Sequence, residues 1–230
     1  MTRIIMIETS TALCSTALAE DGTITSYRES SENRRHASLT APFIKEMLDG
    51  RGIGVQDCDA VCVSMGPGSY TGLRVGTSTA KGLCFGAGIP LLAVGTLDIL
   101  AAQAVSDGLL PEGCRYVVPM IDARRMEVYT ALYSPDGTRL SEIKPEIVEK
   151  GSFAKQLAEG PVLFIGDGAD KCREALEHEN AYFEQCFPKA YAMLRPAEAE
   201  YENKRFKDIA YFEPFYLKQF IATVSGKKLF

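Results

Sequence analysis

Short apolar runs alternate with polar turns through the opening of the chain. The apolar runs at 3–7 and 13–19 have the length of a β-strand, and the more polar segment at 23–28 has the same length. Asp21-Gly22 stands between the second and third runs, and this dipeptide is a hairpin signal. The pattern therefore predicts that the chain begins with an antiparallel meander of strands.

After the meander, the pattern alternates between helical and strand periods. We expect helices over 36–48, 73–86 and 96–105, and buried strands over 59–63 and 90–94. A meander followed by two crossover units is the element order of the ribonuclease H-like fold. The same fold is the repeating lobe of the actin-like (ASKHA) group, although an order of elements indicates no chemistry by itself.

A weaker version of the same order follows residues 106–114, which contain Gly108, Pro111 and Gly113 and are typical of a linker. Strands are predicted over 116–121, 126–133, 138–143 and 161–165, and short helices over 152–158 and 171–176.

We therefore predict an α/β protein with an actin-like, ribonuclease H-like two-lobed fold, in which helices flank mixed sheets. The N-terminal lobe is expected over 1–108 and a smaller C-terminal lobe over 109–230. The tail near 212–217 mixes aromatic residues with proline, and we expect it to pack back on the first lobe.

Two predicted helices carry more apolar or small residues than one buried face requires. On the helix over 36–48, one stripe is Leu39, Phe43 and Met47, and a second is Ala37, Ala41, Ile44 and Leu48. One stripe can face the sheet, and the other needs a cover from this chain or from a partner. The small residues of the helix over 73–86 permit close approach of another helix or backbone. They include Gly76, Ala80, Gly82 and Gly86.

A glycine-rich loop connects the predicted strand over 59–63 to the helix that follows it. Its sequence is Ser64-Met65-Gly66-Pro67-Gly68-Ser69-Tyr70-Thr71-Gly72. Strand, glycine turn and helix form a recurring ligand-facing unit of α/β proteins, and the N–H groups at a helix start can hold an anion. Two interpretations stay open here: an anion cradle, and a tight crossover loop without a ligand.

Composition narrows the functional classes. Hydrophobic residues make up 46% of the 230 residues, which indicates a globular protein. The net charge of −5 does not attract a nucleic-acid backbone, so any RNA contact is local or runs through a partner. Seven cysteines, an odd number, indicate reduced thiols and a cytoplasmic location. No stretch reaches the ~20 apolar residues of a membrane span.

Catalytic signatures are sparse. The chain has two histidines, His36 and His178, and one imidazole on a helix is a poor metal site because stable sites usually need more protein ligands. No Gly-x-Ser-x-Gly nucleophile elbow is present. We therefore expect no metal site and no catalytic set in this chain.

Four motifs resemble a known family, TsaB (also called YeaZ), and together they cover nearly the whole chain. They are Ile7-Glu8-Thr9-Ser10 with Cys14-Ser15-Thr16-Ala17-Leu18, the loop Gly66-Pro67-Gly68-Ser69-Tyr70-Thr71-Gly72-Leu73-Arg74-Val75-Gly76, the run Ile121-Asp122-Ala123-Arg124 with Glu127-Val128-Tyr129, and Pro214-Phe215-Tyr216-Leu217. The resemblance implies a two-lobed actin-like fold and a non-catalytic partner of TsaD. With TsaE, an ATPase, this pair makes threonylcarbamoyladenosine next to the anticodon of tRNA.

The resemblance also implies how the chain meets its partners. TsaD pairs with this family through two N-terminal-lobe helices. We also expect a homodimer through the same helices when the chain is alone, because a self-complementary helix pair needs only two-fold symmetry. TsaE joins the complex, and tRNA is reached only through it. The implied interface residues are His36, Leu39, Thr40, Phe43, Met47, Arg74, Gly76, Thr77, Ala80 and Leu83.

The catalytic relative implied by the resemblance holds a metal with two histidines on one helix face and a carboxylate. Here His36 matches the first histidine, but Thr40 stands where the second belongs. The resemblance therefore implies that this chain is not an enzyme. The glycoprotease-like label attached to the family is inherited from that catalytic relative.

An ATP-binding enzyme of the actin-like or sugar-kinase group remains the alternative, with a glycoprotease-like peptidase behind it. Actin-like ATPases place an acidic residue and glycines at two turns, and Glu8 and Asp122 occupy these places here without the glycines. Water-mediated Mg²⁺ binding by these two carboxylates, with ATP or ADP, belongs to this alternative; otherwise no cofactor is expected. The candidate nucleotide or anion contacts are Glu8, Ser10, Gly66, Gly68, Ser69, Asp122, Gly166 and Gly168.

Overall fold

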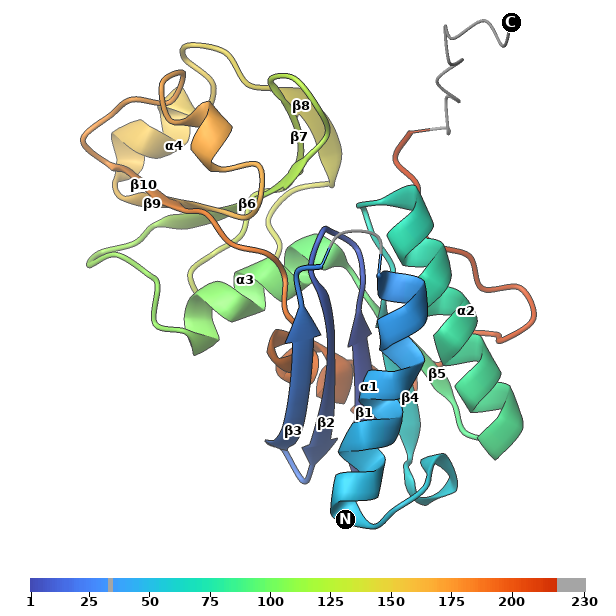
Figure 1. The fold of residues 1–230 in the computed structure, drawn as a ribbon. Coiled ribbons are helices and arrows are strands. Elements are labelled where there is room, and N and C mark those ends of the chain that lie inside the picture. Colours follow the sequence, from blue (N-terminus) through green and yellow to red (C-terminus); the bar gives the residue numbers. More distant parts are fainter. Residues whose placement is uncertain (33–34, 219–230) are drawn as a thin grey trace, which may run out of the picture.

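The computed structural model describes residues 1–32 and 35–218, whose strands form two sheets (Figure 1). The first sheet has the order β3-β2-β1-β4-β5, with β1 antiparallel to β2 and parallel to β4. The predicted meander and both crossover strands are confirmed. The strand bounds are β1 Arg3–Glu8, β2 Cys14–Glu20, β3 Thr23–Ser30, β4 Ala60–Ser64 and β5 Leu91–Val94.

The second sheet repeats the topology of the first. Its order is β8-β7-β6-β9-β10, in which β6 pairs antiparallel with β7 and parallel with β9. This repetition, with helices against both sheets, confirms the predicted two-lobed α/β fold. The strand bounds are β6 Tyr116–Asp122, β7 Glu127–Thr130, β8 Lys144–Ile147, β9 Val162–Ile165 and β10 Ala181–Glu184.

The helices of the first lobe follow the predicted pattern, whereas the second lobe departs from it. The helix bounds are α1 His36–Arg51, α2 Tyr70–Ala87, α3 Thr96–Ser106, α4 Ala154–Glu159 and α5 Leu194–Glu202, with short 3₁₀ turns η1 Val55–Asp57, η2 Asp170–Cys172 and η3 Ala190–Met193.

Two predictions in the second lobe are wrong. The stretch expected as a strand over 138–143 makes only an isolated antiparallel bridge, Tyr133 with Arg139, and the strand β8 follows it. The backbone N–H of Leu132 is bonded to the Ser141 hydroxyl (2.8 Å) rather than to a backbone carbonyl. The helix expected over 171–176 is the 3₁₀ turn η2 followed by turns. The sequence patterns also missed β10 and α5.

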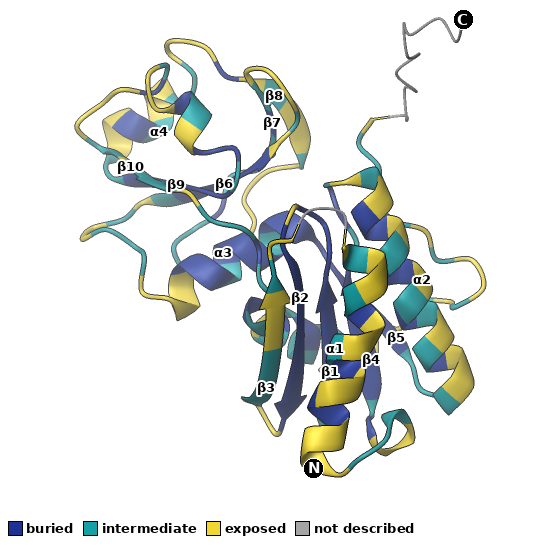
Figure 2. Ribbon diagram, in the orientation of Figure 1, coloured by how far each residue is buried: buried dark blue, intermediate teal, exposed yellow. Residues whose placement is uncertain are grey.

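Alternate side chains of β1 enter two different cores. Ile5 and Ile7 pack against α1 and α2, and Ile4 and Met6 pack against the layer that contains η3 and α5. Helices therefore cover both faces of the first sheet, which makes its central strands dark blue in Figure 2. A strand buried on both faces has a continuous apolar sequence, as β1 does.

Helix α3 joins the two lobes. Its residues Leu97 and Leu100 pack in the core of the second sheet, whereas Ile99 packs in the core of the first. The helix is buried along most of its length and lies between the sheets in Figure 1. The predicted linker over 106–114 follows this helix directly.

The chain returns to the first lobe after β10. The N–H of Ala190 donates to the Ser15 hydroxyl (2.9 Å), and the N–H of Phe215 donates to the Met65 carbonyl (2.7 Å). Lys81 on α2 holds this segment by donating to the carbonyls of Ala210 and Phe212, each at 3.2 Å. The segment from Ala190 to Phe215 therefore lies on the first lobe. The rest of the predicted C-terminal lobe, 219–230, is outside the described residues.

None of the helices that the structure describes has both the length and the apolar character that crossing a membrane requires.

Helix α2 approaches the loop between β1 and β2 more closely than a side chain permits. A Cβ atom on Gly72 would lie 2.0 Å from the Thr9 carbonyl oxygen, and one on Gly76 would lie 2.3 Å from the Thr9 hydroxyl. The helix begins at Tyr70, with the Ser69 hydroxyl accepting the N–H of Gly72 (3.2 Å). Gly72 and Gly76 therefore allow α2 to pack closely against the β1–β2 loop of the same chain.

Gly72→Ala should destabilise the fold by about 1–3 kcal/mol, because its Cβ would overlap the Thr9 backbone. Gly82→Ala, on the same helix, is the matched control. No atom lies within 4 Å of a Cβ placed there, so this change should stabilise by up to about 1 kcal/mol. Urea unfolding of both variants checks the expectation, and equal effects would contradict it.

Candidate functional site

A cavity of about 1010 Å³ lies in the cleft between the two lobes. Five segments converge on it: the β1–β2 loop, the start of α1, the glycine loop with the start of α2, the β6–β7 region, and the returning tail. Asp167 adds a carboxyl from the turn after β9. The residues used below that line it are Ser10, Thr11, His36, Gly68, Ser69, Tyr70, Asp122, Arg124, Tyr129, Asp167, Phe215, Tyr216 and Lys218.

The structure brings together only part of the predicted anion-contact set. Four of those residues line the cavity: Ser10, Gly68, Ser69 and Asp122. Glu8 is fully buried behind Ser10 at the end of β1. Gly66, Gly166 and Gly168 are not among the lining residues.

The chain's own carboxylates occupy the backbone N–H groups that a phosphate would use. The N–H of Ser10 donates to Glu8 Oε1 (2.6 Å), and the N–H of Asp122 donates to Asp167 Oδ1 (2.9 Å). The N–H of Arg124 donates in turn to Asp122 Oδ1 (2.9 Å). A phosphate would have to displace these carboxylates and would be repelled by their charge.

The glycines of the predicted set are required for internal packing. A Cβ on Gly68 would lie 2.3 Å from the Ser10 carbonyl oxygen, and one on Gly166 would lie 2.3 Å from the Met120 carbonyl oxygen. Both turns are therefore pressed against neighbouring backbone. The crossover-loop interpretation accounts for these residues without a ligand.

Two carboxyl groups near the cleft bind protons unusually tightly. Burial raises the pKa of Glu8 to about 7, although hydrogen bonds from Ser10 and Ser64 oppose the shift. Burial also raises the pKa of Asp167 to about 6, and the negative charge of Asp122 adds to the effect. Asp122 itself forms an ion pair with Lys171.

His36 and Thr40 form hydrogen bonds inside this chain. His36 Nε2 lies 2.9 Å from the Thr11 carbonyl oxygen, and the Thr40 hydroxyl donates to the His36 carbonyl oxygen at 2.7 Å. Thr40 is fully buried. Among the described residues, no three His, Cys, Asp or Glu side chains come together in a way that could hold a metal ion.

Half of the predicted partner interface is buried inside this chain. Thr40 and Met47 on α1, and Gly76, Thr77 and Ala80 on α2, are buried, so a partner cannot reach them in this conformation. The buried face of α1 takes Met47 from one predicted stripe and Ile44 and Leu48 from the other, so the helical period did not separate a sheet-facing stripe from a partner-facing one. The predicted residues that stay at least partly accessible are His36, Leu39, Phe43, Arg74 and Leu83.

Phe85 is the accessible apolar side chain that the sequence patterns missed on α2. Phe85 is 83% exposed, and the neighbouring Gly82 and Gly86 are exposed as well. These three positions are spaced three and four residues apart, which places them on one face of the helix. This spacing, which is visible in the sequence, could have identified the exposed face of the helix.

In the cleft, the patterns missed Thr11 and Asp167. Asp167 stands between Gly166 and Gly168, so the glycine pair marked its position without indicating its role. Its contact with Asp122 spans 45 residues, a separation that periodicity does not report.

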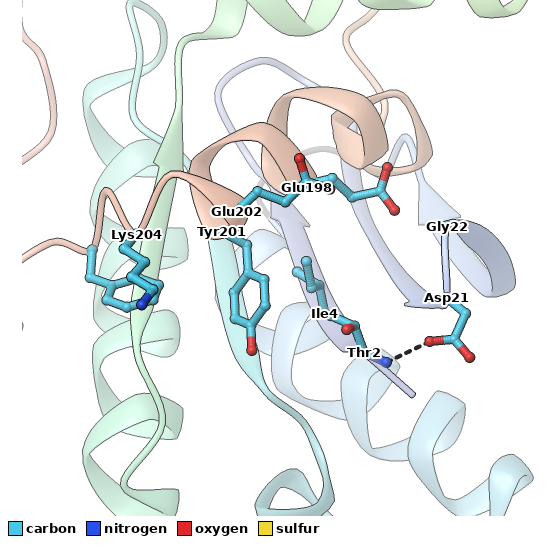
Figure 3. Close-up of a pocket in the computed structure, with 9 residues that line it drawn as sticks. Thr2, Ile4, Asp21, Gly22, Glu198, Tyr201, Glu202 and Lys204 are labelled. Carbon is cyan, nitrogen blue, oxygen red and sulfur yellow. Dashed lines mark hydrogen bonds between the residues drawn. The ribbon is translucent and has the colours of Figure 1, made fainter.

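A smaller cavity of about 470 Å³ lies on the first lobe, between the start of the chain and α5 (Figure 3). Asp21, Glu198 and Glu202 line it, together with Tyr201 and Lys204, and the N–H of Thr2 donates to Asp21 Oδ1 (2.6 Å). None of the predicted site residues lies there.

Two lobes of identical strand order, joined by α3 and facing a shared cleft, define an actin-like two-lobed α/β protein. The family model of TsaD, tRNA N6-adenosine threonylcarbamoyltransferase, matches residues 28–217. The TsaB protein of Escherichia coli K12 is 31% identical over 237 residues, which covers 99% of this chain and 98% of that protein.

Two further comparisons also match TsaB or YeaZ proteins. The Bacillus subtilis TsaB protein is 32% identical over 178 residues, covering 76% of this chain and 75% of that protein. The solved structure of YeaZ from Pseudomonas aeruginosa superposes with a TM-score of 0.82 at 27% identity, covering 94% of this chain and 100% of that one. The chain belongs to the TsaB (YeaZ) family, as its motifs predicted.

The buried Glu8 carboxyl should couple stability to pH. Its folded pKa of about 7 lies above the ordinary value of 4.5, so the folded chain keeps a proton that the unfolded chain releases. The free energy of unfolding therefore falls as pH rises between these values. Glu8→Gln removes this penalty and should stabilise by on the order of 2–3 kcal/mol near pH 8, with the gap shrinking toward pH 5.

Urea unfolding at several pH values measures this gap. Glu46→Gln, the same change on an exposed position of α1, is the control and should follow the parent chain at each pH. A gap between Glu8→Gln and the parent that does not vary with pH would show that Glu8 does not titrate in this range.

Proposed function

We propose that this chain takes part in making threonylcarbamoyladenosine on tRNA as a non-catalytic partner of TsaD. The observation that carries the proposal is the similarity to TsaB, named a tRNA threonylcarbamoyladenosine biosynthesis protein, over 99% of this chain. In this proposal TsaE joins the pair, tRNA is contacted through the complex, and the setting is the cytoplasm.

Three features of the chain support a role without catalysis. The α1 position that would hold a second metal-binding histidine is the buried Thr40, which is bonded to the His36 carbonyl. The cleft N–H groups are already bonded to carboxylates. The turn glycines are in contact with backbone. These features count against a metallopeptidase and against an actin-like ATPase, and they support the proposal that the chain needs no cofactor.

The accessible side of α1 and α2 is the proposed partner surface. Phe85 offers an apolar anchor, and the exposed Gly82 and Gly86 beside it allow another helix to approach closely. Toward the start of α2, the Arg74 guanidinium lies 4.3 Å from the centre of the Tyr70 ring. The same surface also suits a homodimer, because a two-fold axis needs only one self-complementary patch.

Reconstitution tests the role. The purified chain is combined with TsaD, TsaE, ATP, a threonylcarbamoyl donor and unmodified tRNA, and modified adenosine is measured by nucleoside mass spectrometry. We expect modification only when TsaD is present, and its loss when this chain is omitted. ATP turnover or modification by this chain alone would overturn the non-catalytic assignment.

Phe85→Asp should weaken binding to TsaD by at least ~10-fold, because an exposed aromatic anchor is replaced by a charge. Its thermal unfolding should match that of the parent, since the side chain makes little contact inside the chain. Ile147→Asp, at a 63% exposed position on the second lobe, is the matched control. Equal binding by both variants in calorimetry would place the interface elsewhere.

A further inference from the structure

Two aromatic side chains of the first lobe are far more exposed than the others. Phe85 on α2 is 83% exposed, and Tyr211 is 84% exposed. Tyr211 belongs to residues 207–216, here called the return segment. Apart from Met1, the next most exposed large apolar side chain among the described residues is Ile147, at 63%. Single exposed apolar residues are common on protein surfaces, so their meaning depends on whether they lie together.

Lys81 connects the positions of these two rings. It stands four residues before Phe85, one helical turn away and about 40° around the axis of α2. Its Nζ atom donates to the carbonyl oxygens of Ala210 and Phe212, each at 3.2 Å, and these residues flank Tyr211. The return segment runs beside α2 in Figure 1. Phe85 and Tyr211 therefore border the same contact between helix and segment.

The same side of α2 meets the return segment at its other end. Tyr70 and Arg74 lie eleven and seven residues before Lys81, which is close to three and two helical turns. The Tyr70 ring lies 5.0 Å from the Tyr216 ring, centre to centre, and the Arg74 guanidinium lies 4.3 Å from the centre of the Tyr70 ring. We call the strip along this contact the α2 seam, which consists of Tyr70, Arg74, Lys81, Phe85, Tyr211 and Tyr216.

The backbone around Tyr211 is fixed although the residue is exposed. Asp208 Oδ1 accepts the N–H groups of Ala210 (2.8 Å) and Tyr211 (3.2 Å). The N–H of Phe212 donates to the Asp208 carbonyl oxygen (2.8 Å). Ile209 and Phe212 pack against the core that α1 and α2 cover, whereas Tyr211 stays outside it. A turn that is already ordered lowers the entropy cost of burying this ring against a partner.

The seam suits a partner built like this chain. The family model of TsaD matches residues 28–217, a range that contains both α2 and the return segment. A TsaD chain therefore has counterparts of both strips, and two related surfaces can pair about a local two-fold axis. The seam is also continuous with the partner surface proposed above, because Phe85 belongs to both.

We propose that the α2 seam is part of the surface that binds TsaD, with Phe85 and Tyr211 as its two aromatic anchors. This inference rests on the proposed function, which names TsaD as the partner and places the contact on α1 and α2. It adds the return segment to that surface. Large aromatic side chains that become buried at the centre of an interface supply much of its binding energy.

Tyr211→Asp should weaken binding to TsaD by at least ~10-fold, because a charge replaces an apolar anchor. Tyr211→Phe should bind nearly as the parent does, since it keeps the ring. Calorimetry with purified TsaD measures both, and the thermal unfolding of both should match that of the parent because Tyr211 is exposed. Tyr182→Asp, the same change at an exposed position of β10, is the matched control and should bind as the parent does.

Phe85→Asp, measured beside these variants, separates the possible failures. If the parent chain does not bind TsaD, the proposed function fails and this inference fails with it. If Phe85→Asp loses binding and Tyr211→Asp does not, the contact stays on the helices and this inference alone is overturned. Sedimentation equilibrium of the chain without TsaD covers the other occupant. Weaker self-association of Tyr211→Asp with unchanged TsaD binding would make a second copy the occupant and overturn the proposal.

Discussion

The contact between α2 and the β1–β2 loop fixes the rest of the first lobe. The Ser69 N–H donates to the Ser10 carbonyl (2.6 Å), and the Thr9 hydroxyl donates to the Gly72 carbonyl (2.8 Å). Only glycine fits at the closest points, so the helix rests on backbone rather than on side chains. This contact places the start of α2 at the cleft and leaves the opposite side of the helix accessible to a partner.

The cleft keeps the architecture of a ligand site while its groups are used differently. Its turns come from the ends of β1, β6 and β9, and there Glu8, Asp122 and Asp167 accept backbone N–H groups. Burial at the base of the cleft raises the pKa values of Glu8 and Asp167, because water no longer solvates their charged forms.

Local patterns predicted the first lobe well and the contacts between distant segments poorly. The continuous apolar run of β1 and the Asp21-Gly22 turn identified the meander because both signals are local. Small residues on α2 correctly indicated close packing, but the pattern cannot say which surface supplies the cover. Ala80, which the family resemblance implied for the partner interface, is buried inside this chain. Glu8 and Asp122 were predicted as acids of the cleft, but Asp167 was not. Its hydrogen bond with Asp122 joins residues that lie 45 positions apart in the sequence.

The return of the chain to its first lobe makes the second lobe an insertion. The face of β1 that carries Ile4 and Met6 is completed by η3 and α5, which the chain supplies only after the whole second sheet. During synthesis, the emerging first lobe therefore has an uncovered apolar face until nearly all of the polypeptide has left the ribosome. The lobe that carries α1 and α2 is begun first and completed last, so its folding depends on an intact second lobe.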